Sequence, residues 1–289
     1  MPAVARPTLL LLVIVAYGVS YAYLDRTMQG QSVKLQSAPP LKVLQTMSGY
    51  FEQISSEMIF IQTSVFLGGL KKLGTVVEDY DTELAHNFRT MTSLYPDFID
   101  PYYLTNAFLA PASRYGAEQA DLVFDTGITA YPKDFVLRFF KGANLFYNLQ
   151  QPLQAADAFA KAAKIEDAPP MFAHLAAIFS GRSGELKAGL IMLQTMANAE
   201  KNELVKERYN EEIECFKQAI AVQNAIDLYT KEHGIPPKFL QQLVPKYINA
   251  IPTIEKRFVL VYKPPKVSLE RPVLPPTRKP AKSTTIENP

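Results

Sequence analysis

Few side chains in this sequence are of the types that carry acid–base, metal or nucleophilic chemistry. Asp97 and Asp100 lie at a predicted helix junction, and Glu211 and Glu212 are adjacent in a helical pattern. Paired carboxylates work as acid and base only when a buried cleft separates their pKa values. Aspartates at a helix junction cap helices, and the two glutamates belong to a strongly charged face. We therefore predict structural roles for both pairs.

Metal and thiol sites are not indicated either. His86, His174 and His233 show no metal-binding spacing, and a single cysteine, Cys215, excludes a disulfide within the chain. We interpret His174 as a partly buried packing residue or a surface residue. The sequence holds no glycine-rich phosphate loop, no G-x-S-x-G and no H-E-x-x-H pattern. We predict a protein that is not an enzyme, with no metal site, no cofactor and no small-molecule substrate.

Composition allows a large core and gives no strong overall charge. The 289 residues are 48% apolar with a formal net charge of +2, which does not indicate nucleic acid as a ligand. Residues 263–289 carry six Lys and Arg against two Glu, which leaves +4 there and −2 in the rest. Residues 271–289 are rich in Pro, Lys, Ser and Thr. They have too few apolar side chains to offset the entropy of ordering, so we predict a disordered tail.

The N-terminal residues 1–30 predict a signal-anchor. Residues 8–24 read TLLLLVIVAYGVSYAYL without a charge, near the lower limit for crossing a hydrocarbon core of about 30 Å. Tyr17, Tyr21 and Tyr23 lie near its end, where aromatic rings favour the membrane interface. We favour an uncleaved, single-pass anchor in a bacterial inner membrane, with most of the chain in the periplasm. The alternative is a signal cleaved after Ala22, which would leave a secreted protein.

A period of about 34 residues runs through the middle of the chain. A small residue, a bulky one and another small one recur at Ala120, Phe124, Gly127; at Ala155, Phe159, Ala162; at Ala188, Met192, Thr195; and, more weakly, at Leu84, Phe88, Met91. A preceding helix carries an aromatic, a small pair and a second aromatic at Phe139, Gly142, Ala143, Phe146 and again at Phe172, Leu175, Ala176, Phe179. Small residues let two antiparallel helices approach, and such units must stack to bury their apolar stripes.

These units resemble tetratricopeptide repeats, most clearly over residues 134–164 (DFVLRFFKGANLFYNLQQPLQAADAFAKAAK). The resemblance extends over about residues 84–199. The order of membrane span, helical region, repeats and C-terminal part is similar to that of bacterial membrane-anchored tetratricopeptide proteins of undefined role. The resemblance implies an all-α solenoid of helical hairpins over residues 81–200, whose first helices line a concave face that binds a partner. The alternative is an unrelated helical bundle with alanine-rich stripes.

Candidate partner-binding residues follow from the helical spacing within residues 135–149. If the aromatic and small positions face the core, the inner face of this helix carries Phe140, Asn144, Tyr147 and Asn148. By resemblance, Tyr102 and Thr105 hold the corresponding places one unit earlier. Amides satisfy peptide groups while rings bury side chains, so this face would suit an extended peptide. The alternative is an ordinary semi-polar helix face.

Residues 41–80 predict a long helix that caps or precedes the repeats. Its apolar side chains recur at spacings of three and four, at Leu44, Met47, Phe51, Ile54, Met58, Ile61 and Val65. We interpret this stripe as packing onto the first repeat, and the alternative is a helical arm between membrane and repeats.

Residues 201–270 predict one more helix and a small α+β module. The helix covers residues 203–232, stops at His233-Gly234, and carries Tyr209, Ile213, Phe216 and Ile220 on one face. Residues 258–262 and 267–269 predict a β-hairpin across Pro264-Pro265. This ending is similar to the helix–loop–strand ending of pseudopilin-like and secretion-associated proteins.

The sequence therefore predicts a non-enzymatic scaffold or assembly subunit. It would be held in the membrane by residues 8–24 and would bind one or more proteins of a membrane-associated complex through the concave face of the repeats. The alternative is a structural component of a secretion or pilus-like machine that acts through its long helix and its C-terminal module.

Overall fold

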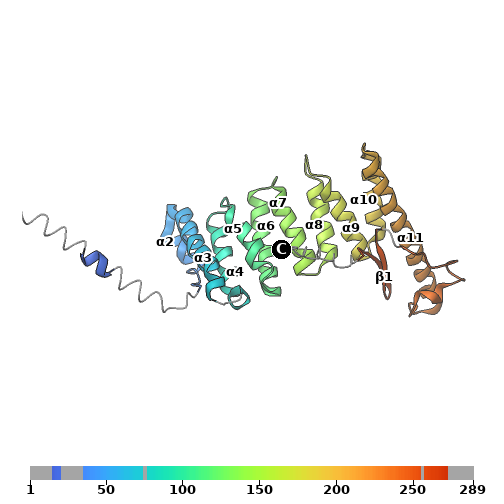
Figure 1. The fold of residues 1–289 in the computed structure, drawn as a ribbon, viewed down its shortest axis with the longest axis horizontal. Helices are drawn as coiled ribbons and strands as arrows, with labels where there is room; N and C mark the ends of the chain where they lie inside the picture. Colours follow the sequence, from blue (N-terminus) through green and yellow to red (C-terminus); the bar gives the residue numbers. More distant parts are fainter. Residues whose placement is uncertain (1–14, 21–34, 74–76, 255–256, 273–289) are drawn as a thin grey trace, which may run out of the picture. The chain divides into compact units, whose positions relative to one another are not determined.

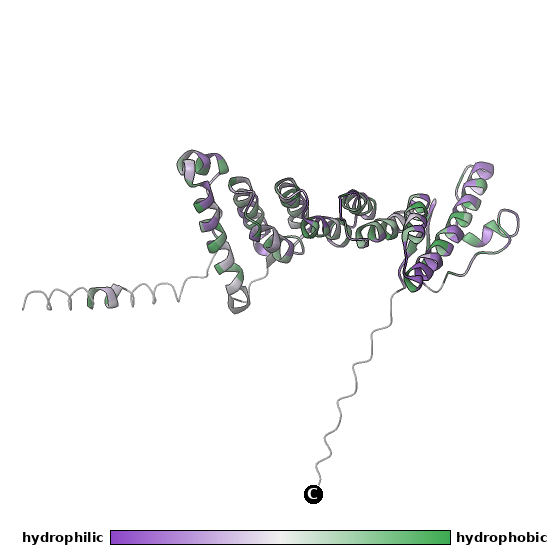
Figure 2. Cartoon of the chain, turned by 90° about the horizontal axis from the view of Figure 1, so that it is seen from above, coloured by the Kyte–Doolittle hydropathy of each residue, from purple (hydrophilic) through white to green (hydrophobic). Residues whose placement is uncertain are grey.

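The computed structural model describes residues 15–20, 35–73, 77–254 and 257–272 (Figure 1). They are mostly helical, which confirms the prediction of a mainly α chain. Apolar and polar bands alternate along the helices, as expected for elements that bury one face (Figure 2). The chain divides into two compact units, residues 1–116 and 117–289.

Unit 1 is built around the packing of two long helices, α3 and α4. Its elements are α2 (Leu41–Ser48), η1 (Gly49–Phe51), α3 (Glu52–Leu73), η2 (Val77–Tyr80), α4 (Asp81–Leu94), α5 (Asp100–Leu104) and the π-helical segment η3 (Thr105–Leu109). Asn87 of α4 is buried and holds the segment before α2. Its side-chain oxygen accepts from the Ala38 amide at 2.7 Å, and its nitrogen donates to the Gln36 carbonyl at 3.0 Å.

The prediction of one long helix over residues 41–80 is wrong. Gly49 ends α2 with φ 51°, a conformation that favours glycine, and a short 3-10 turn leads into α3. The prediction that the apolar stripe packs onto the first repeat is also wrong. The side chains of Met47, Phe51, Ile54, Met58, Ile61 and Val65 are exposed. Helix α3 instead packs on α4 through a different face, where Ser56 donates to the Met91 carbonyl at 3.0 Å.

Unit 2 is a series of helices that pack in sequence order, followed by one hairpin. Its elements are α7 (Phe135–Ala143), the π-helical segment η4 (Asn144–Asn148), α8 (Pro152–Ala163), α9 (Met171–Ser183), α10 (Leu186–Ala199), α11 (Glu203–His233), η5 (Leu240–Leu243), β1 (Val259–Lys263) and β2 (Lys266–Glu270). Helix α6 (Arg114–Ala130) begins in unit 1 and continues into unit 2. Helix α7 packs on α8, α8 on α9, α9 on α10 and α10 on α11.

Local signals set several helix ends in unit 2. The Asp134 carboxylate caps α7 by accepting from the Leu137 amide at 2.8 Å, and the Asn202 side chain caps α11. Pro152 is the first residue of α8, where the missing backbone N–H of proline costs the helix no hydrogen bond.

In unit 1, Asp100 is the first residue of α5 and Ile99 holds the cap position, so the predicted capping role of Asp100 is wrong.

The core of unit 2 agrees with the predicted repeat pattern in its first two copies. Ala120, Phe124, Gly127, Ala155, Phe159 and Ala162 are all buried. The third copy is displaced by one residue. Ala188 and Thr195 are exposed, whereas Gly189 and Leu193 are buried. A Cβ atom at Gly189 would lie 2.4 Å from the Phe216 ring and 2.8 Å from the Ala177 carbonyl. The close approach of α9 and of α11 to α10 therefore selects Gly189 as the inward position.

The C-terminal part of unit 2 confirms the predicted helix and hairpin. Helix α11 ends at Gly234, whose φ of 75° is left-handed, and β1 pairs with β2 as an antiparallel hairpin. Strand β2 packs against α9 and α11. Its Val267 and Leu269 are buried, and Phe258, just before β1, contacts the Phe216 ring edge-on with centroids 5.8 Å apart.

Two predictions fall mainly outside the described residues. Of the predicted membrane segment only residues 15–20 are described, and they are helical. Among the described residues, no helix combines the length and apolar content needed to cross a bilayer. The predicted tail at 271–289 lies outside the description except for its first two residues.

Candidate functional site

The two groove residues predicted in unit 1 are buried. Tyr102 is inaccessible, and its hydroxyl donates to the Pro96 carbonyl at 2.8 Å. Thr105 is equally inaccessible, and its hydroxyl donates to the Pro101 carbonyl at 2.8 Å. Neither side chain is open to a partner in this structure, so the exposed position predicted for both is wrong.

The four groove residues predicted in unit 2 do not form one open face. Asn144 is 1% exposed, donates to the Ala117 carbonyl at 2.9 Å and accepts from Asn148 at 3.0 Å. Phe140 and Asn148 are half-buried, with the Phe140 ring 6.0 Å from that of Phe124. Tyr147 alone among the four is exposed, at 67%. The prediction that Asn144 is a surface residue is wrong.

Asn144 keeps α-helical dihedral angles and lies two turns after the inaccessible Leu137, so it belongs to the buried face of α7. The Leu149 amide donates to the Asn144 carbonyl, five residues back, which is the π-helical pattern. This wider turn rotates the side chains beyond Asn144 relative to a continuous α-helix. Among the positions predicted to face the core, Gly142 is buried, Phe139 is 37% exposed, and Ala143 and Phe146 are half-buried. The segment η3 after α5 has the same π-helical turn, since the Ala110 amide donates to the Thr105 carbonyl.

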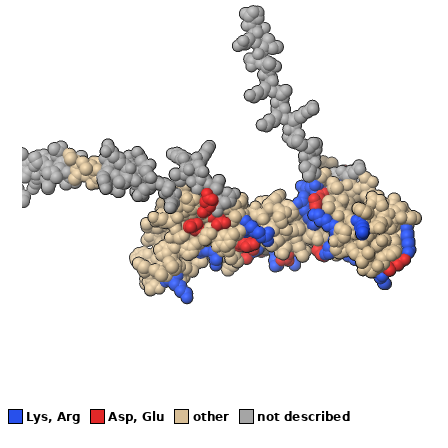
Figure 3. Space-filling model, turned by 90° about the horizontal axis from the view of Figure 1, so that it is seen from below, with Lys and Arg blue, Asp and Glu red and all other residues tan. Residues whose placement is uncertain are grey.

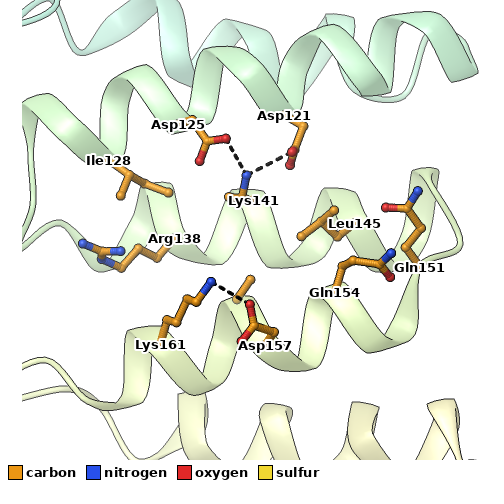
Figure 4. A pocket seen from close by; sticks show the side chains of 11 residues that line it. Asp121, Asp125, Ile128, Arg138, Lys141, Leu145, Gln151, Gln154, Asp157 and Lys161 are labelled. Atoms are coloured by element: carbon orange, nitrogen blue, oxygen red, sulfur yellow. Dashed lines mark hydrogen bonds and ion pairs between the residues drawn. The ribbon is translucent and has the colours of Figure 1, made fainter.

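The structure instead places a cavity of about 420 Å³ among α6, α7 and α8, on another face of α7 (Figure 4). Its lining combines charged, amide and apolar side chains: Asp121, Asp125, Ile128, Arg138, Lys141, Leu145, Gln151, Gln154, Asp157, Ala158 and Lys161. We call this feature the α6–α8 cavity. All of its lining residues belong to unit 2.

Lys141 is the central charge of the α6–α8 cavity. Its ammonium group donates to the Asp121 carboxylate at 2.9 Å and to the Asp125 carboxylate at 2.8 Å (Figure 4). The two aspartates are four residues apart on α6, one helical turn, so both reach the same cation. Asp121 and Lys141 have side chains about one-fifth exposed, whereas Asp125 is 57% exposed.

Burial opposes ionisation of Asp121 and Lys141, and two buried polar atoms of this cluster lack a hydrogen-bond partner among the described residues. Burial raises the pKa of Asp121 above its ordinary value, although the hydrogen bond and charge of Lys141 oppose the shift. Burial also lowers the pKa of Lys141, but bonds to the two aspartates outweigh it, so this pKa is raised. Asp121 Oδ1 and Arg138 Nε are buried and have no hydrogen-bond partner among the described residues. The Arg138 guanidinium does donate to the Pro132 carbonyl at 2.6 Å.

The chemistry of the α6–α8 cavity suits recognition of a polar chain. Three acidic and three basic side chains line it, so it has no net charge, and Asp157 pairs with Lys161 at 2.7 Å. Gln151 and Gln154 add amides that both donate and accept, and Ile128, Leu145 and Ala158 add apolar surface. Within the described ranges, no group of three or more His, Cys, Asp or Glu side chains is placed to hold a metal ion.

Spacing in the sequence did contain a signal for this cavity. Asp121 with Asp125, and Asp157 with Lys161, are each four residues apart on predicted second helices of repeats. Such pairs are common on solvated helix faces. Only the packing of α7 between α6 and α8 shows that Lys141 joins Asp121 and Asp125.

A second polar cluster lies between α9 and α11, where His174 and Glu212 are both buried. The His174 Nε2 atom lies 2.8 Å from a Glu212 oxygen, and the Arg208 guanidinium lies 3.5 Å from the other oxygen. The interpretation of Glu212 as part of a charged surface is therefore wrong. Glu211, its neighbour, does reach the surface and pairs with Arg257 at 2.8 Å.

No protein-family model matches this chain, and neither a characterised protein nor a solved structure shows significant similarity to it. The resemblance to tetratricopeptide repeats thus stays a prediction from residue spacing.

The Lys141 cluster gives a pH-dependent prediction. We expect Lys141→Met to lower the free energy of unfolding by about 1–3 kcal/mol at neutral pH, less than for a fully buried pair because both partners remain partly exposed. Without the cation, the folded-state pKa of Asp121 rises further above its unfolded value. The folded variant then holds a proton that the unfolded chain has released, so its stability falls as pH rises through that window. The loss of stability should therefore be smaller near about pH 4.5 than at neutral pH. Urea unfolding at both pH values measures it.

The matched control is Lys161→Met. This lysine forms an exposed pair with Asp157, so its loss should change stability by no more than about 0.5 kcal/mol at either pH. Equal losses in the two variants, or a Lys141→Met loss independent of pH, would contradict the buried cluster.

Proposed function

We propose that this chain is a non-enzymatic scaffold subunit that binds an extended segment of a partner protein in the α6–α8 cavity. The observation that carries the proposal is the neutral, amide-containing lining of this cavity. An extended peptide presents alternating donors and acceptors, and the glutamine amides and the paired charges offer both kinds of partner. The face in Figure 3 shows both acidic and basic side chains on a largely uncharged surface.

The finer fold in this proposal is a tetratricopeptide-like array. It is supported by the sequential packing of α7 to α11 and by the burial of the small and bulky positions in two predicted repeats. The tight contact of Gly142 with Phe159, where an added Cβ would lie 2.4 Å from the ring, is the kind of close helix approach that such repeats need.

The proposal includes a membrane tether through residues 8–24, on the apolar run and its tyrosines. The chain would then be a single-pass protein of a bacterial inner membrane, with its two units on the periplasmic side. A secreted form, released after Ala22, is the alternative. Partners would be proteins of a membrane-associated complex.

The second candidate function is a structural role in a secretion or pilus-like machine. It is favoured by the exposed apolar side chains of α3. Such a role would use protein–protein contacts through α3 and the C-terminal module, and would leave the α6–α8 cavity without a ligand.

The experiment is co-isolation of partners from detergent-solubilised, carbonate-washed membranes, with the full chain as bait. The Gln151→Ala/Gln154→Ala variant removes the amides of the cavity and should lose the partner. Gln194→Ala removes an exposed amide on α10 and should keep it. Surface changes of this kind usually alter stability by less than about 0.5 kcal/mol, so melting curves should be unchanged.

Each other outcome has a defined meaning. Loss of the partner in Tyr147→Ala alone would place the binding face where the sequence first predicted it. Retention in all variants would reject the cavity as a binding site and favour the second candidate. Release of the full chain by the carbonate wash would reject the tether.

A further inference from the structure

Helix α3 has two apolar faces, and unit 1 uses one of them. Ile59, Phe66 and Leu67 are buried within unit 1. On the other face, four apolar side chains of α3 and Phe51 at the end of η1 are each more than half exposed, and we call them the α3 stripe: Phe51, Ile54, Met58, Ile61 and Val65. A helix that is apolar on both sides is normally covered on both sides.

The α3 stripe is large enough to be an interface. Five half-exposed apolar side chains present on the order of 500 Å², which matches the largest and often functional patches of monomeric proteins. The stripe is also uninterrupted, because it advances one helical turn at a time. Scattered exposed apolar residues need no partner, but a continuous stripe of this size indicates one.

The spacing of the α3 stripe suits a helical partner. Its members follow one another by three, four, three and four residues, which is a seven-residue repeat over two positions. These are the spacings of the core positions of a coiled coil, in which two helices pack through such stripes. The next position of this repeat is Gly68, exposed and without a side chain, where two helices can approach closely.

The charges near the α3 stripe disfavour binding to an anionic lipid surface or to a strongly charged partner. Residues 41–94 carry four Lys and Arg against six Asp and Glu, a net −2 that disfavours anionic lipid. The positions that flank the repeat between residues 48 and 64 are Ser48, Tyr50, Ser55, Glu57, Gln62 and Ser64. A single charge among six means little repulsion between two copies, and no charge pattern that selects a different helix.

We propose that the α3 stripe is the interface of a homodimer in which the stripes of two copies pair in parallel. The same repeat on both helices makes the contact self-complementary, as a two-fold interface requires. Two stripes bury about 1,000 Å² in total, near the lower limit for a specific interface. The parallel direction rests on the proposed membrane tether, which would hold both N-termini in one plane at an effective concentration near the mM range.

Cysteine cross-linking in the full chain tests this pairing. In a Cys215→Ala background, Ile61→Cys places a thiol in the stripe, and Gln53→Cys places one at an exposed position of α3 outside it. Under mild oxidation, Ile61→Cys should give a reducible band of twice the chain mass, and Gln53→Cys should stay at one chain. Equal cross-linking in both would show random collision and overturn the proposal.

A charge variant provides the second arm. The protein mass in detergent should be that of two chains for the parent and for Gln53→Glu, and should fall to one chain for Ile54→Glu/Ile61→Glu with unchanged helicity. A parent mass of one chain would overturn the proposal, and thiol labelling of Ile61→Cys would then identify the occupant. Shielding by anionic vesicles alone would indicate lipid, and shielding without vesicles would indicate the chain's own residues 8–24. Because these readouts concern self-association, their failure leaves the proposed partner site untouched.

Discussion

Phe159→Ala is expected to lower the free energy of unfolding by about 3–5 kcal/mol. The Phe159 ring is 1% exposed and lies among the rings of Phe139, Phe172 and Phe179, with centroids 5.5 to 6.1 Å apart. Truncation removes its apolar contacts and leaves a cavity between α8 and the neighbouring helices α7 and α9. A typical domain is stable by about 5–15 kcal/mol, so the loss is a large fraction of the total. Urea unfolding followed by circular dichroism measures it.

The control is Phe239→Ala, the same substitution at a residue that is 67% exposed, where the change should stay within about 0.5 kcal/mol. A second variant tests the contact between α7 and α8. A Cβ atom at Gly142 would lie 2.4 to 2.6 Å from three atoms of the Phe159 ring, so Gly142→Ala should cost about 1–3 kcal/mol by overpacking. Combined with Phe159→Leu, its cost should be smaller, because the shorter side chain makes room. Strict additivity would contradict the described contact.

Glu212→Ala is expected to cost about 1–3 kcal/mol, because it removes one partner of a buried hydrogen bond. Glu212 is 3% exposed and accepts a hydrogen bond from His174, itself buried, while the Arg208 guanidinium lies on its other side. Without the carboxylate, the imidazole is left without its acceptor inside the protein. The measurement is again equilibrium unfolding in urea.

Glu211→Ala is the matched control one residue away. Its carboxylate pairs with Arg257 near the surface, and exposed pairs contribute about 0–1 kcal/mol. Replacing both His174 and Glu212 by leucine should recover much of the loss, because a buried pair can be exchanged for apolar packing at little cost. Indistinguishable losses at Glu211 and Glu212 would mean that α11 is rotated from its described orientation.

The sequence could predict those features whose signals are local. The end of α11 at Gly234 and the hairpin across Pro264-Pro265 are set by residues a few positions apart. The buried Ala155, Phe159 and Ala162 of α8 follow from the repeat of about 34 residues.

Features that depend on distant contacts could not be predicted. Ala188 and Gly189 are both small, and only contacts with the Phe216 ring of α11 and the Ala177 carbonyl of α9 decide which one faces inward. Glu211 and Glu212 are chemically equal in the sequence, and only His174 on α9 distinguishes them. The buried position of Asn144 depends on α6, because the Ala117 carbonyl accepts the hydrogen bond of its side-chain amide.

The Phe216 ring has a consequence for dividing the chain into fragments. It fills the space beside two glycines on two other helices, since an added Cβ at Gly181 or Gly189 would lie within 2.6 Å of it. A fragment that stopped at residue 200, where the repeat pattern ends, would leave this space open to water on α9 and α10. It would also remove β2, which packs against α9. Limited proteolysis should accordingly spare the segment from α9 to β2 as one piece, and shortened versions of this protein should keep it whole.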